Sequence, residues 1–256
     1  MTESHVVPVS MDRHARRWWR RARDFSYALS HSAVRLDAAE SEAAAAHLPI
    51  AFRAGTNELV ALLHSGGKPA VVAEDGYWRA DYLPQSLRIA PFLFLPLDGG
   101  KDALAVDESF GLVTEDPRDE RFFTPGGKPS EAIAPLLEEA APRIARAHET
   151  ARAVAALRAA NLLEPLAGHA GFEGVNADAL KALSGPTLHI LHQAGALALA
   201  HHQRASLSVL PRLAAFADPK NAHIVAPHQA GAAPSSGLSD FLSAVALAHQ
   251  TGEELL

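Results

Sequence analysis

Aromatic and basic side chains that could bind a ligand are concentrated in residues 75–92, DGYWRADYLPQSLRIAPF, of a chain that is only 6% aromatic. Trp78 and Tyr82 offer flat rings with a polar tip, and Arg88 could hold a carboxylate in a bidentate pair. These three residues are a candidate binding site, and an enzyme site of unknown reaction on the same sheet face is the alternative. The competing structural interpretation places the rings in the core and Arg88 in the interior, satisfied by a carboxylate or carbonyl group.

The local pattern indicates how this segment would hold its side chains. A turn at DG precedes residues 77–82, whose alternation as a strand puts Trp78 and Tyr82 on one face. Pro84 suits the first position of a helix, and Pro91 limits that helix to a turn or two, because the residue before a proline avoids helical geometry. The following FLFL predicts a buried strand.

A second concentration of binding chemistry is the arginine-rich arm, residues 12–25, DRHARRWWRRARDF. A helix would gather its arginines in one arc and Trp18 and Trp19 in the opposite one. Such a helix could lie on an anionic membrane surface or bind an acidic partner, so Trp18 and Trp19 are candidate binding residues as well. Alternatively, the apolar face packs on its own domain and the arginines are solvated. An extended arm would place the two tryptophans on opposite faces.

Other residue types with ligand chemistry form no complete pattern. His189 and His192 stand three positions apart and His201 and His202 follow, yet no carboxylate in that segment completes a transition-metal site. Both GGKP sequences carry a proline after the lysine, and neither has the spacing of a phosphate-binding loop. The sequence therefore predicts no metal, no cofactor and no catalytic residue.

Composition narrows the function classes. The net charge of −6 argues against a nucleic-acid partner, and the absence of cysteine excludes disulfides and thiolate metal sites. The longest stretch without a formal charge, residues 184–203, is interrupted by histidines and glutamines, which favours a buried soluble helix pair over a transmembrane segment. No signal peptide is recognisable, so a cytoplasmic location is expected, with surface association left open.

These side chains must be positioned by an α+β domain, which we expect over residues 1–216. A helix is predicted over residues 37–46, where Asp37 and Glu40 have the spacing of a capping box. Short apolar runs divided by glycine-rich turns predict an antiparallel sheet at about 48–115, and helical spacings after it predict packed helices, kinked or broken at Pro142. Residues 217–256 predict a Pro/Gly/Ala-rich linker and a short terminal helix.

Several segments together resemble the bacterial SapC-like family. GYWRADYLPQSLRIAPF, residues 76–92, resembles its W-x-x-x-Y-x-P-x-x-x-R-x-x-P-F signature. Further matches follow in the family's order: HLPIAF at 47–52, FFTPGGKPSE at 122–131, LLEP at 162–165 and LHQAGALALAHHQRASL at 191–207. The resemblance covers roughly residues 5–216. The chain departs from it in the arginine-rich arm, in Arg35 where proline is usual, and in its C-terminal tail.

The resemblance implies a role more than a reaction. The family is associated by name with a bacterial surface layer and with peptide transport. It tends to be encoded near flavin-dependent halogenase-like and cupin-like proteins and outer-membrane receptors, and no catalytic residues are established for it. It therefore implies a non-enzymatic binding or accessory protein with protein partners of those kinds, acting in a cell-surface or a peptide uptake and modification system.

Overall fold

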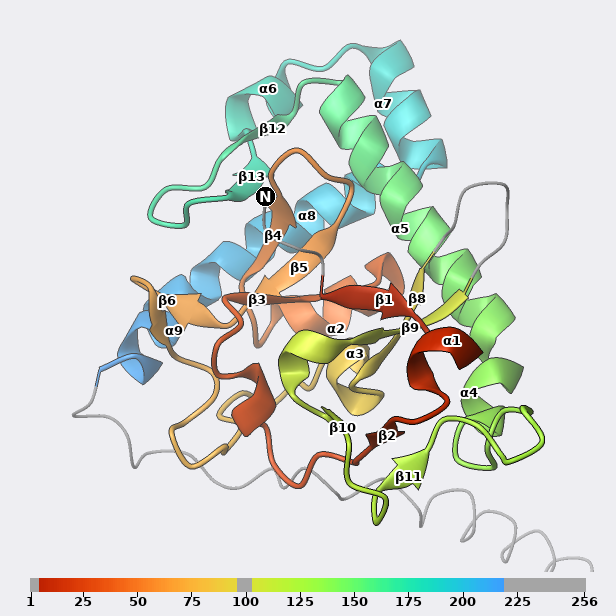
Figure 1. The fold of residues 1–256 in the computed structure, drawn as a ribbon. Helices are drawn as coiled ribbons and strands as arrows, with labels where there is room; N and C mark the ends of the chain where they lie inside the picture. Colours follow the sequence, from red (N-terminus) through yellow and green to blue (C-terminus); the bar gives the residue numbers. More distant parts are fainter. Residues whose placement is uncertain (1–4, 96–102, 219–256) are drawn as a thin grey trace, which may run out of the picture.

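The computed structural model describes residues 5–95 and 103–218 of the 256-residue chain. The fold is α+β, as predicted, with several antiparallel sheets flanked by helices (Figure 1). The largest sheet has five strands in the order β12 (Leu163–Pro165), β13 (Phe172–Val175), β4 (Ile50–Arg53), β5 (Leu59–Leu62) and β3 (Ala33–Arg35).

Smaller sheets complete the β-structure. One has the order β1 (Val6–Pro8), β9 (Ala103–Asp107) and β8 (Phe92–Leu95), and another the order β10 (Val113–Thr114), β2 (Trp18–Trp19) and β11 (Glu120–Arg121). Strands β6 (His64–Ser65) and β7 (Lys68–Pro69) form a separate hairpin. The strands within residues 48–115 are therefore divided among several sheets. Strands that come before and after this range complete these sheets.

The helices vary widely in length, and α5 is the longest of those described. The α-helices are α1 (Met11–His14), α2 (Ser41–Ala45), α3 (Gln85–Arg88), α4 (Ala134–Glu138), α5 (Ala140–Ala159), α6 (Ala177–Lys181), α7 (Gly185–Gln193), α8 (Ala196–Ser206) and α9 (Leu210–Phe216). The short 3-10 helices are η1 (Ser26–Ala28), η2 (Ala38–Glu40), η3 (Glu108–Phe110) and η4 (Leu207–Val209).

Buried polar side chains of α8 fix this helix to the five-stranded sheet. Ser206 Oγ accepts the Ile50 N–H at 2.8 Å, and Gln203 Oε1 accepts the Val175 N–H at 3.0 Å. Gln203 Nε2 donates to the Ile50 carbonyl at 3.3 Å. Both side chains are fully buried, so these bonds satisfy groups that would be costly to leave unpaired. Helix α8 also packs on α2, and the sheet is thereby held on that side (Figure 1).

Two hydrophobic clusters form the interior. The larger surrounds the five-stranded sheet and contains Phe52 and Trp78. The smaller lies around β8, β9 and β2, where the Trp19 ring meets the edge of Phe92 with centroids 4.7 Å apart. Strands β3 and β8 therefore belong to different sheets and different clusters, and the region between them is where the candidate site lies.

The arginine-rich arm differs from a continuous helix. Helix α1 ends at His14, and Trp18 and Trp19 form the short strand β2, which pairs with β10 and with β11. The prediction of a helix over residues 12–25 is therefore wrong after His14. The alternative of an extended arm is confirmed at Trp18 and Trp19. Ladder partners about a hundred residues away in the sequence decide this conformation, and the local amphipathic pattern contains no information about them.

The aromatic segment is less regular than expected. Residues 77–82 do not form a strand, because Trp78 makes only an isolated bridge with Val72. The predicted alternation is nonetheless confirmed, since Trp78 and Ala80 are buried and Asp81 is exposed. The short helix between the two prolines is also confirmed as α3, and FLFL as β8.

Three further expectations concern the helices and the tail. The break predicted near Pro142 falls at Glu139, between α4 and α5, and Pro142 lies in the first turn of α5, where its missing N–H has no helical partner to lose. The linker and terminal helix predicted after residue 216 lie almost wholly outside the described residues. Within residues 5–95 and 103–218, no helix has the length and apolar character needed to cross a membrane.

Candidate binding cleft

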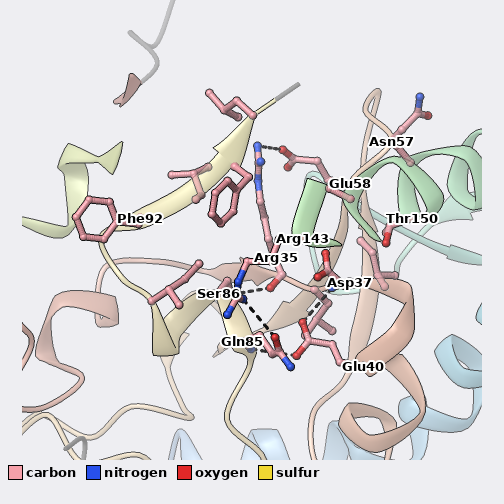
Figure 2. Close-up of a pocket in the computed structure, with 18 residues that line it drawn as sticks. Arg35, Asp37, Glu40, Asn57, Glu58, Gln85, Ser86, Phe92, Arg143 and Thr150 are labelled. Atoms are coloured by element: carbon pink, nitrogen blue, oxygen red, sulfur yellow. Dashed lines mark hydrogen bonds and ion pairs between the residues drawn. The ribbon is translucent and has the colours of Figure 1, made fainter. Parts of the chain in front are cut away.

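A cleft of about 340 Å³ lies between strand β8, the adjoining ends of β3 and β5, and helix α5 (Figure 2). Its apolar lining comes mainly from β8 and α5, and its polar lining from the segments after β3, before β5 and at the start of α3. The residues that line it include Arg35, Asp37, Glu40, Glu58, Gln85, Ile89, Phe92, Leu93, Phe94, Leu95, Arg143, Ala147, Thr150 and Ala151.

Helix α5 contributes one of its faces to the cleft. Arg143, Ala147, Thr150 and Ala151 are spaced so that they share a single side of a helix. The two alanines are small, and neither belongs to a hydrophobic core cluster, so this side of the helix leaves room for a ligand. Thr150 Oγ1 accepts the Ala38 N–H at 2.8 Å and thereby fixes α5 to the start of η2.

Charged side chains are held at opposite ends of the cleft, and Figure 2 shows the Arg35–Glu58 ion pair at one end and the contact of Arg143 with Gln85 at the other. At one end the Glu58 carboxylate accepts from Arg35 and, at 2.7 Å, from Arg53 Nε. At the other end Arg143 pairs with Glu139 at 2.6 Å and approaches Gln85 Oε1 at 3.4 Å. Arg35 and Arg143 are therefore each paired with a carboxylate of the fold.

Glu40 is the polar centre that joins the aromatic segment to the cleft. Its side chain is only 8% exposed, and its carboxylate accepts the Tyr82 hydroxyl at 2.7 Å, the Gln85 N–H at 3.0 Å and the Asp37 N–H at 3.0 Å. The last bond belongs to the predicted capping box, which is confirmed. These three donors satisfy the buried carboxylate, and they join Glu40 of η2 to the start of α3.

The pKa shifts around Glu40 follow from burial and charge. Burial raises the pKa of Asp37, and the neighbouring Glu40 charge raises it further, while Arg146, with Nε 3.6 Å from the Asp37 carboxylate, opposes the shift. Burial likewise raises the pKa of the Tyr82 phenol, and its hydrogen bond to Glu40 adds to the effect. Tyr82 is therefore a neutral hydrogen-bond donor at all ordinary pH values.

The three predicted site residues of the aromatic segment have different environments in the structure. Trp78 is 1% exposed, and its Nε1 donates to the Tyr82 carbonyl at 3.0 Å, so its ring is part of the core. Tyr82 is half-buried and is bound to Glu40. The prediction that Arg88 is interior is wrong: this side chain is exposed, and its Nε donates to the Leu83 carbonyl at 3.2 Å. None of the three residues is among those that line the cleft.

The other predicted site residues, Trp18 and Trp19, lie in β2 and are partly buried and buried, respectively. Several arginines of the arm are paired with carboxylates from residues 108–120. The pairs are Arg13 with Glu108 at 2.6 Å, Arg17 with Glu115 at 3.7 Å and Arg21 with Glu120 at 3.0 Å. Ion pairs of three of its six arginines thus bind the arm to the rest of the fold.

The histidines are dispersed. Within the parts of the chain that the structure describes, no group of three or more His, Cys, Asp or Glu side chains is arranged to hold a metal ion. His189 and His192 are exposed on α7, whereas His202 Nδ1 lies 2.8 Å from the Ser41 hydroxyl. That contact helps to join α8 to α2.

Reasoning from the sequence did not identify the residues of the cleft as a site. The sequence pattern predicts Asp37 and Glu40 only as a helix cap, and it marks Arg35 only as a departure from a family pattern. The available signal is Glu40 itself, because an acidic residue in an alanine-rich helix needs hydrogen-bond donors if it is buried.

The comparisons with known proteins give one family. The SapC family model matches residues 9–213, which is most of the chain. No curated protein and no solved structure matches.

Proposed function

The chain belongs to the SapC family, and from that premise we propose that it is a non-enzymatic binding protein that uses the cleft between β3, β8 and α5 to hold a partner. The partner would belong to a bacterial cell-surface system or to a peptide uptake and modification system, as the family association suggests. Halogenase-like or cupin-like enzymes and outer-membrane receptor systems are the partners to examine first.

The observation that carries this proposal is the state of the charged groups in the cleft. Arg35 and Glu58 are paired with each other, Arg143 with Glu139, and Asp37 with Arg146, while Glu40 accepts hydrogen bonds from the fold. Because these charged side chains are paired within the fold, their role is to hold the walls of the cleft in place. The groups left to meet a ligand are the apolar side chains of β8 and α5, as in binding sites that are mostly apolar with a few polar groups around them.

The catalytic alternative around Trp78, Tyr82 and Arg88 gains no support from the described residues. Trp78 is occupied in the core, Tyr82 is bound to Glu40, and Arg88 is exposed to solvent. The binding function is therefore the one that we propose.

The test is affinity capture from the native host with a variant that fills the cleft. Ala147→Trp places a large ring in the cleft without removing any hydrogen bond, and Ala145→Trp is the matched control on an exposed site of the same helix. We expect a partner, identified by mass spectrometry, that is captured by the wild type and by Ala145→Trp and is lost with Ala147→Trp. Identical partner sets for all three proteins would contradict the proposal.

A further inference from the structure

Strand β8 ends its sheet, and its outer edge has no strand partner among the described residues. The backbone register shows which groups are left there. The Asp107 N–H donates to the Pro91 carbonyl at 2.9 Å, so residues 91 and 107 form a hydrogen-bonded pair. Because such pairs alternate along an antiparallel ladder, Leu93 and Leu95 also bond to β9, whereas the Phe92 and Phe94 backbone groups are directed to the opposite edge.

The bonds on the far side of β9 confirm this register. The Leu104 carbonyl, opposite Phe94, accepts the Val9 N–H at 2.8 Å and therefore faces away from β8. On the outer edge of β8, the Phe92 N–H is used by the Ile89 carbonyl at 2.8 Å. The Phe92 carbonyl and both backbone groups of Phe94 have no hydrogen-bond partner in the described parts of the chain.

This edge borders the cleft. The consecutive residues from Phe92 to Leu95 all line it, although alternate side chains of a strand point to opposite faces. A cavity that contacts every residue of a strand lies along its edge. Across the cleft, α5 contributes the small side chains of Ala147 and Ala151, which leave space in this part of the cleft, while Arg143 on the same face of the helix is paired with Glu139.

We propose that the cleft takes an extended peptide segment of a partner protein, which adds as a strand to the free edge of β8. This inference rests on the proposed binding function and names the kind of ligand. Exposed strand edges attract further strands, and the free carbonyl of Phe92 and N–H and carbonyl of Phe94 would supply the ladder bonds. A strand opposite the four residues of β8 would be about 13 Å long.

The lining of the cleft also determines which peptide would fit. Apolar side chains line the cleft on both sides, Leu93 and Leu95 on β8 and Ala147 and Ala151 on α5, so the side chains of an added strand that enter the cleft should be apolar. The volume of about 340 Å³ is near the lower limit of ligand sites, roughly 300–1,000 Å³, and restricts the segment to a short one.

The experiment uses a displayed library of random linear 12-residue peptides, selected on the full chain and counter-selected on Ala147→Trp. Selected peptides are then resynthesised with a single N-methyl group at each position in turn. Strand addition uses alternate amides of the peptide, so methylation at every second position should weaken binding about tenfold or more and the intervening positions should change it little. Amide exchange at Phe94 should slow in the complex, and Ala145→Trp should bind as the wild type does.

The outcomes separate this inference from the proposed function. Strand addition is overturned if the peptides need an open cleft but N-methylation weakens their binding with no alternation along the sequence. It is also overturned if the sensitive positions are spaced three and four apart, as in a bound helix. In both cases the cleft remains a binding site. Peptides that bind Ala147→Trp as well as the wild type, or a selection that yields no peptide, overturn strand addition too. If host capture is also unaffected by Ala147→Trp, the proposed function fails with it.

Discussion

The hydrogen bond from Tyr82 to Glu40 should stabilise the fold more than an ordinary tyrosine bond does. Its acceptor is a carboxylate that is only 8% exposed, at 2.7 Å, and Tyr82→Phe removes the hydroxyl while keeping the ring. Hydrogen bonds to charged groups contribute about 1.5–3 kcal/mol. Because Tyr82 is half-buried and water can reach part of the site, we expect a loss near the lower limit, about 1.5–2 kcal/mol.

Tyr27 provides the matched control. Its hydroxyl donates to the Leu87 carbonyl at 3.0 Å, which is a neutral acceptor, so Tyr27→Phe should cost about 0.5–1.5 kcal/mol. Urea unfolding followed by circular dichroism gives both free energies of unfolding, and an unchanged m-value would show that the denatured state is the same.

A double-mutant cycle assigns the effect to the pair. Glu40→Gln removes the charge, and the combined variant should lose less than the sum of the single changes, with a coupling energy of about 1 kcal/mol or more. Additive losses, or a Tyr82→Phe loss below that of Tyr27→Phe, would refute the view that Glu40 is held by a charge-assisted bond from Tyr82.

Three further outcomes are expected. Gly76→Ala should destabilise the chain by more than the roughly 1–2 kcal/mol that a left-handed backbone costs, because the new Cβ would lie 2.6 Å from Oδ1 of Asp24. Thermal melts measure this loss, and the control is Gly67→Ala, where φ is also positive but the space around the Cβ is open. Burial lowers the pKa of His14, so the unfolded chain binds the proton more tightly. The free energy of unfolding should therefore fall as pH drops below about 6.5. Urea titrations at several pH values measure this decrease, and an equally steep decrease in a His14→Gln variant would contradict the role of His14. The arginine-rich arm should bind anionic vesicles weakly and only at low salt in co-sedimentation, because three of its six arginines are paired with carboxylates of the fold. Tight binding at high salt would show that the arm leaves the rest of the fold.

The sequence determined those features whose causes are local. The capping box of Asp37 and Glu40 depends on a spacing of three residues within one turn. The length of α3 depends on Pro84 and Pro91, which restrict their own neighbours wherever they stand. Composition and alternation were enough for the α+β class and for the burial of Trp78, because apolar side chains must leave water whatever the details of packing.

Only the tertiary structure decided the features that depend on distant segments. The arm is extended because β10 and β11 supply its ladder, and Arg88 is exposed although its neighbours in sequence are apolar. The cleft needs β3, β8 and α5 to meet, and pairing with β9 leaves β8 one edge that has no strand partner among the described residues. Strand pairing joins residues by backbone groups that every amino acid carries, so the side-chain pattern of one segment does not specify its partner or the edge that stays open.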